Sequence, residues 1–231
     1  MAENKVLYKD GDLSYCILTQ DYKNEAHEIL AEIFCDMPAC QTRLECNSKL
    51  TRKIVKEFWF QYIGCDMYDF ITEGLSVIAL DTKNNEIAGI MATRHLLTCA
   101  EYKARYPKHE YEGAILVDLC AILDEEATKK MPELTEPNKT VEMAFLGVHS
   151  EYRGKNIANN LVRLSLPVIK AAGYTYASLI ATSYFSSRVS EKNGFTSIHE
   201  IDVRSLLWKG GKTLQNMKEP HGHYKYWVKK L

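Results

Sequence analysis

The chain has 231 residues, of which 46% are hydrophobic and 26% charged, and 29 basic against 30 acidic residues leave a formal net charge of −1. This length suits one domain with a sizeable core. The near-zero charge argues against nucleic-acid binding, because no basic stripe is present to neutralise phosphates. No apolar leader and no run of membrane-spanning length is visible, so we expect a cytoplasmic protein that does not bind membranes.

The seven cysteines are odd in number and do not cluster along the chain. No Cys-x-x-Cys spacing and no pairing of His with Cys indicates zinc, so we expect no metal site. Reduced thiols, most of them buried, are the simplest interpretation for a cytoplasmic protein.

The first hundred residues have the pattern of a strand, two amphipathic helices and a hairpin. Asp21 is a candidate N-cap for the first helix, and Pro38 disfavours helix in the residue before it. Asn84 and Asn85 lie between two apolar segments, which is typical of a hairpin turn. The predicted elements are a strand at 13–19, a helix from Asp21 to about residue 37, a helix at 51–62, and hairpin strands at 75–81 and 86–97.

Residues 98–139 have a weaker pattern, with candidate helices at Cys99–Tyr106 and Asp118–Lys130. About 40 residues are more than a hairpin needs, and long insertions near sites often shape or cover them. We predict that this segment is a helical insertion that borders the substrate pocket. The alternative is a helical excursion that only packs on the sheet.

The most informative stretch is 153–158, which lies between a predicted strand at 140–149 and a predicted helix that begins near Ile157. Free backbone N–H groups and the positive end of the helix dipole meet at such a turn, which makes it a candidate anion site. Gly154 lets the backbone approach a ligand, while Arg153 and Lys155 add charge. The alternative is an ordinary left-handed turn with two solvated basic residues.

The order of elements after this turn carries a resemblance to a known family. A strand at 174–182, a short helix opened by Ser183 and a Gly-Phe pair at 194–195 follow the helix. This order resembles the core of the GCN5-related N-acetyltransferase (GNAT) superfamily, in which the loop cradles the pyrophosphate of acetyl-CoA. Arg153, Asn156 and Ala158 occupy the three positions of the family's loop pattern. Asn156 replaces the usual Gly, and Asn tolerates positive φ better than other non-glycine residues.

The resemblance implies a single α/β domain over residues 1–231, with a central mixed twisted sheet of about seven strands flanked by helices. It also implies acetyl-CoA as co-substrate, with no metal. A backbone N–H near 146–148 would serve as oxyanion donor. The residues expected at the cofactor are Leu146, Gly147, Val148, Arg153, Gly154, Lys155, Asn156, Ile157, Ala158, Ser183 and Ser187.

Three segments are similar to insect-type arylalkylamine N-acetyltransferases, including dopamine N-acetyltransferase: 146–161, 182–195 and the Pro220-His221 pair. The resemblance implies roles in catalysis or pocket shape for Thr182, Ser186 and His221. Helix capping is the alternative for the two hydroxyl residues, and a surface position is the alternative for the histidine.

The general base departs from the pattern of that branch. Its Asp-Glu-Pro segment supplies a glutamate base, whereas this chain has Asp36-Met37-Pro38, and methionine cannot accept a proton. Asp36 is one residue away. Glu142 on the predicted strand is the preferred candidate, because the resemblance implies a water-holding glutamate on that strand in many members of the superfamily. Alternation also places it on the face of Ala144, Leu146 and Val148. A rim carboxylate paired with a lysine is the alternative.

A tyrosine that commonly serves the superfamily as general acid is also missing, since Ser190 occupies its position. The predicted function is an acyltransferase that moves an acetyl group from acetyl-CoA to the primary amine of a small arylalkylamine. The alternatives are a polyamine or protein/peptide N-acetyltransferase and a non-catalytic CoA-binding module. We expect a monomer or weak dimer.

Overall fold

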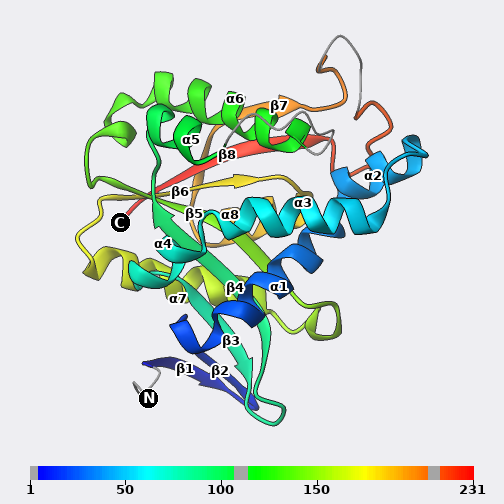
Figure 1. Cartoon of the computed structure of the whole chain (residues 1–231). Helices are drawn as coiled ribbons and strands as arrows, with labels where there is room; N and C mark the ends of the chain where they lie inside the picture. The colour runs from blue at the N-terminus through cyan, green and yellow to red at the C-terminus, as the bar shows by residue number, and fades with distance from the viewer. Residues whose placement is uncertain (1–4, 107–113, 208–213) are drawn as a thin grey trace.

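The computed structural model describes residues 5–106, 114–207 and 214–231. Within these residues, eight strands form one mixed sheet in the order β1-β2-β3-β4-β5-β6-β8-β7, and helices cover both faces (Figure 1). The predicted α/β class is confirmed, with one strand more than the expected seven. The strands are β1 Val6–Asp10, β2 Leu13–Ile17, β3 Val77–Asp81, β4 Glu86–His95, β5 Thr140–Val148, β6 Tyr176–Ala181, β7 Thr196–Asp202 and β8 His223–Lys230.

The helices divide between the two faces of the sheet. One core contains side chains of α1, α3, α4 and α6, whereas the other contains the apolar stripe of α7. No helix in the described part of the chain is both long and apolar enough to cross a bilayer. The α-helices are α1 Lys23–Cys35, α2 Pro38–Cys46, α3 Arg52–Gly64, α4 Met67–Thr72, α5 Cys99–Arg105, α6 Ala114–Lys130, α7 Ile157–Ala171 and α8 Tyr184–Lys192, and the 3₁₀ turns are η1 Gln20–Tyr22, η2 Pro132–Thr135 and η3 Ser150–Tyr152.

The first predicted helix begins later than its expected cap. Asp21 lies within η1, and Tyr22 occupies the N-cap position of α1 without a side-chain hydrogen bond. The predicted end near Pro38 is correct, but α2 begins at this same proline. A proline is tolerated in the first turn of a helix, because the N–H it lacks would have no partner there. The break therefore separates two helices where the sequence predicted only one.

A β-bulge in β5 changes which side chains share a face. Ala92 of β4 pairs with Phe145 and Thr93 pairs with Met143, so Ala144 is an extra residue in β5. Phe145 belongs to the core under α1 and α3, whereas Met143 belongs to the core under α7. The expected common face of Glu142 with Leu146 and Val148 is therefore wrong, because strict alternation does not continue through a bulge.

β5 and β6 run parallel but remain paired over a short stretch only. Their register includes three pairs, Thr140 with Tyr176, Val141 with Ala177, and Glu142 with Ser178. Beyond Glu142 the two strands separate, although each continues to its own carboxyl end. The separation opens the middle of the sheet at the carboxyl ends of two parallel strands, where α/β proteins commonly bind ligands.

Gly89 of β4 allows α7 to pack tightly against the sheet. A Cβ atom at Gly89 would lie 3.0 Å from the Gly147 carbonyl oxygen and 3.0 Å from Ile157 Cγ2. We expect Gly89→Ala to lower the free energy of unfolding by about 1–3 kcal/mol through overpacking. Urea denaturation measures this, with exposed Thr196→Ala as a control that shifts stability by about 0.5 kcal/mol or less. Equal stability of the two variants would contradict the packing described.

Candidate active site

A cleft of about 740 Å³ lies where β5 and β6 separate. It is bordered by the carboxyl half of β5, the 153–156 loop, the start of α7 and the start of α8. Nine of the eleven predicted cofactor residues line it, namely Leu146, Gly147, Val148, Arg153, Gly154, Asn156, Ile157, Ala158 and Ser183. The other two are not among its lining residues: the Lys155 Nζ lies 4.8 Å from the centre of the Tyr152 ring, and the Ser187 N–H donates to the Ser183 carbonyl.

The loop before α7 has the backbone conformation that the sequence indicates. Asn156 has φ +59° and ψ 14°, in the left-handed region, and Gly154 has φ +79°. The Asn156 side chain makes no capping hydrogen bond to the start of α7. A Cβ atom at Gly154 would meet nothing within 4 Å, so space remains beside this backbone. The turn thus presents the positive end of a 15-residue helix to the cleft.

The start of α8 forms the opposite wall of the cleft. Ser183 is its N-cap and forms a capping box with Ser186, whose Oγ lies 2.9 Å from the Ser183 Oγ. The Ser186 hydroxyl therefore has a capping partner as well as a position on the cleft wall. His221 supports the same helix, since its Nδ1 accepts a hydrogen bond of 3.3 Å from the Tyr184 N–H. Burial lowers the pKa of His221, which keeps that nitrogen free to accept.

A second cavity, of about 260 Å³, meets the cleft at a junction formed by Phe34, Met37, Ala144, Ile180 and Thr182, which line both spaces. We call it the inner cavity. Thr182 is therefore the predicted hydroxyl residue that lies at the junction, while Ser186 lines the outer cleft only. The inner cavity is lined by rings from α1, α3, α5 and β5, which are Phe34, Trp59, Tyr62, Tyr102 and Phe145.

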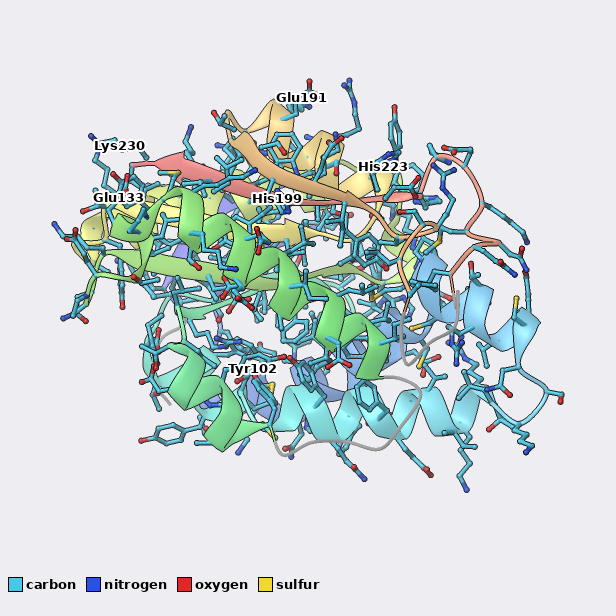
Figure 2. All side chains as sticks on the ribbon, turned by 90° about the horizontal axis from the view of Figure 1, so that it is seen from above. Tyr102, Glu133, Glu191, His199, His223 and Lys230 are labelled. Atoms are coloured by element: carbon cyan, nitrogen blue, oxygen red, sulfur yellow. The ribbon has the colours of Figure 1, made fainter. Side chains whose placement is uncertain are left out.

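Helices α5 and α6 close the inner cavity on the side away from α7. Seen from above, α6 lies across the sheet, and Tyr102 projects from α5 between α6 and α3 (Figure 2). The Tyr102 hydroxyl lies 3.1 Å from the Tyr62 hydroxyl of α3. On α6, Val117, Cys120 and Ala121 face the cavity. The 98–139 segment therefore contributes a wall of this space.

Glu142 lines the inner cavity as part of a buried ion-pair network. Its Oε2 lies 2.8 Å from Nη1 of Arg94, a side chain only 3% exposed. Arg94 Nε lies 3.4 Å from Asp66 Oδ1, and Arg105 Nη1 lies 2.9 Å from the same oxygen. Although burial acts in the opposite direction, the Glu142 and Asp66 carboxylates raise the pKa of Arg94. The guanidinium therefore stays charged and balances Glu142.

Asp124 of α6 is a cavity residue that the sequence analysis missed. Burial, together with the charge of the nearby Glu142, raises its pKa to about 7. A signal for it exists, because Val117, Cys120 and Asp124 recur at helical spacing and share one face of a largely apolar helix. An acidic residue on an apolar face deserves a functional test, since perturbed carboxyl groups gather at active sites.

Asp36 occupies a different environment from Glu142. It accepts a hydrogen bond of 2.5 Å from Arg52 and lies 4.0 Å from Arg153, and it lines the cleft but not the inner cavity. Met37 stands at the junction of the two spaces. The two ion pairs suit a role in placing the 153–158 loop beside α1.

One cluster in the described part of the chain has the spacing of metal ligands. Ligand atoms of Asp69, Glu73 and His95 lie within 4.8 Å of one another. Asp69 already pairs with Arg105, and His95 Nδ1 lies 2.6 Å from Glu73. None of the three lines the cleft or the inner cavity.

No protein-family model matches the chain, and no curated protein matches its sequence. Among solved structures, the chain is similar to arylalkylamine N-acetyltransferase 2 from Aedes aegypti, with a TM-score of 0.75 and 19% identity over 95% of this chain and 99% of that chain. It is also similar to the mosquito arylalkylamine N-acetyltransferase like 5b, with a TM-score of 0.74 and 21% identity over 95% of this chain and 100% of that chain. A third similar structure is the Drosophila melanogaster polyamine N-acetyltransferase, with a TM-score of 0.68 and 18% identity over 95% of this chain and 100% of that chain. The chain therefore has the GNAT fold.

The left-handed residue before α7 provides a direct test of the loop conformation. Alanine adopts the left-handed region less readily than asparagine does, so we expect Asn156→Ala at φ +59° to lower the free energy of unfolding by about 1 kcal/mol. Asn156→Gly accepts this φ without strain, so its stability should stay at or above that of the unaltered chain. Urea denaturation of both variants compares them, and equal losses would argue against a left-handed conformation.

Proposed function

We propose that this protein is an acetyl-CoA-dependent N-acetyltransferase that acetylates the primary amine of a small arylalkylamine. One observation carries the proposal: an open cleft with a helix N-terminus meets an aromatic inner cavity where β5 and β6 separate. Two reactants can enter from opposite sides and meet at the junction. Holding both in place is itself a large part of catalysis in a bimolecular transfer.

The cleft suits acetyl-CoA in charge and in shape. The N-terminus of α7 and Arg153 would hold the pyrophosphate. From Met143 onward the edge of β5 that faces β6 is not paired with it, so the extended pantetheine arm can lie along backbone groups as an added strand does. This arrangement directs the thioester toward Ala144 and Thr182 at the junction.

The chemistry needs a neutral amine and a donor for the oxyanion. The ammonium group loses one proton, its nitrogen attacks the thioester carbonyl carbon, and the C–N bond forms while the carbonyl electrons move to oxygen. A backbone N–H in the 146–148 segment would stabilise that oxyanion. The C–S bond then breaks with its electron pair on sulfur, and the nitrogen loses a second proton. The products are the N-acetylamine, CoA thiol and one proton.

The lining of the inner cavity favours an aryl group over a chain with several cations. Phe34 packs against Trp59 and Phe145 with ring centres 5.1 Å and 5.0 Å away. Such rings offer apolar area and edge-to-face contacts to an aromatic substrate. Glu142 adds little net negative charge, because Arg94 balances it. A polyamine is the second candidate, supported by the likeness to the Drosophila polyamine enzyme and by the carboxylates of α6.

The first experiment is thiol release from acetyl-CoA with tryptamine, tyramine, dopamine, serotonin, spermidine, agmatine, amino acids and a short peptide. We expect release with the aromatic amines, because their rings fit the aromatic cavity. Release with spermidine or agmatine alone would support the polyamine alternative. A thermal shift with CoA but no release with any amine would support a non-catalytic CoA-binding module and contradict an enzyme.

Filling the inner cavity should separate amine use from cofactor binding. Ala121 lines the inner cavity but not the cleft, and Ala121→Phe would occupy the space of the aryl group. We expect kcat/KM for the best amine to fall at least tenfold, while the thermal shift caused by acetyl-CoA is unchanged. Glu126→Gln on the same helix, which lines neither space, is the matched control. Full activity of Ala121→Phe would place the amine elsewhere.

A further inference from the structure

We propose that Asp124 of α6 is the general base, accepting the proton that the substrate ammonium group must lose before it attacks the thioester. The inference rests on the proposed acetyl transfer and assigns its proton acceptor to an element other than α1 and β5. Three observations carry it: the place of Asp124 in the inner cavity, the ion pairing of the other candidate carboxylates, and the groups that face Asp124.

Asp124 lies on the wall that faces the substrate space. It follows Val117, Cys120 and Ala121 along the cavity face of α6, and Glu142 and Arg94 line the same cavity. An ammonium group placed among the aromatic rings with its nitrogen toward the junction therefore has this carboxylate within the same enclosure. A base must share the cavity of the proton it removes, directly or through one water.

The two other candidates are engaged with basic side chains. Protonating Glu142 would break its 2.8 Å ion pair and leave the buried Arg94 with Asp66 as its remaining acidic partner. Losing one partner of a buried pair is costly. Asp36 is held by Arg52 and Arg153 and lies outside the inner cavity. Within the described part of the chain, Asp124 has no ion-pair partner, so its negative charge is available to a cation.

The groups around Asp124 set its pKa. Glu142 of β5 raises its pKa and Arg94 of β4 lowers it, while the Tyr226 hydroxyl of β8 also lowers it. Burial has the largest effect, and it raises the pKa of Asp124 to about 7. On α6 itself, burial raises the pKa of Cys120 to about 12, so this thiol stays neutral.

Two further charged groups lie close to Asp124 or at the end of α6. Glu125 also lines the inner cavity and pairs with Lys129 at 2.9 Å, whereas His199 of β7 lies 2.9 Å from Nζ of Lys130, the last residue of the helix. A carboxyl group with a pKa near the working pH can accept a proton and release it again in each cycle. Asp124 has a pKa in this range and lies in the inner cavity.

The proton balance is complete with groups already named. The N–H bond of the ammonium breaks and an O–H bond forms on Asp124, which leaves a neutral amine with its lone pair free. After attack, the nitrogen gives its second proton to the departing CoA sulfur. Asp124 then releases its proton to solvent, which accounts for the one proton that the overall reaction produces.

The pH dependence of kcat/KM tests the assignment. Asp124 must be ionised to act, so kcat/KM should fall as the pH decreases through about 7. Asp124→Asn should reduce kcat/KM roughly 10²–10⁴-fold and abolish this acidic limb. Glu142→Gln should keep the limb but move its midpoint to lower pH, because the charge that raises the pKa of Asp124 is gone. Glu126→Gln should leave rate and midpoint unchanged.

Binding controls separate a proton acceptor from a residue that only supports the fold. All variants should retain the thermal shift caused by acetyl-CoA, and Asp124→Glu should recover part of the rate together with an acidic limb. A limb that survives Asp124→Asn and disappears in Glu142→Gln would overturn the inference and assign the base to Glu142. Absence of thiol release from the unaltered protein with every amine would instead overturn the proposed function, and the base assignment with it.

Discussion

The early end of the pairing between β5 and β6 is the constraint on which the rest of the structure depends. Three residue pairs hold the strands together, and beyond Glu142 their edges are separated. The cleft and the inner cavity both open from this gap and share Ala144 and Thr182 as common wall. The bulge at Ala144 acts at the same point, because it turns Phe145 toward the inner cavity while Leu146 packs toward α7. Backbone pairing thus fixes where the cleft and the inner cavity meet.

Charge compensation decides what the inner cavity presents to a ligand. Arg94 is buried at the floor between Glu142 and Asp66, and Arg105 and the Tyr106 hydroxyl complete the pairing around Asp66. A buried guanidinium with two carboxylate partners is stable only as a set, since removing one partner leaves an uncompensated charge. The network therefore supports the wall of the cavity, and the aromatic rings and α6 supply the rest of its lining.

Features with strong local signals could be predicted from the sequence. The 153–158 turn, the positive φ of Asn156 and the start of α7 near Ile157 follow from residue type and spacing, and the structure confirms them. The bulge at Ala144 has no such signal, because pairing with β4 produces it rather than any property of residues 140–148. Helix α2 was missed because Pro38 marks an end and a beginning equally well. The environment of Asp124 depends on Glu142, which is near it only after the chain has folded.

The burial of Asp124 lowers the stability of the folded protein at neutral pH. Raising a carboxyl pKa from 3.8 to about 7 lowers the free energy of unfolding by roughly 4 kcal/mol at pH values above 7. The sign follows from proton binding: the folded state holds the proton more tightly, so stability decreases as the pH rises from about 4 to about 7. An asparagine at this position would avoid that cost. The acid therefore destabilises the fold, although it lies beside an aromatic cavity where Met37 cannot accept a proton. This combination favours a catalytic role for Asp124 over a structural role.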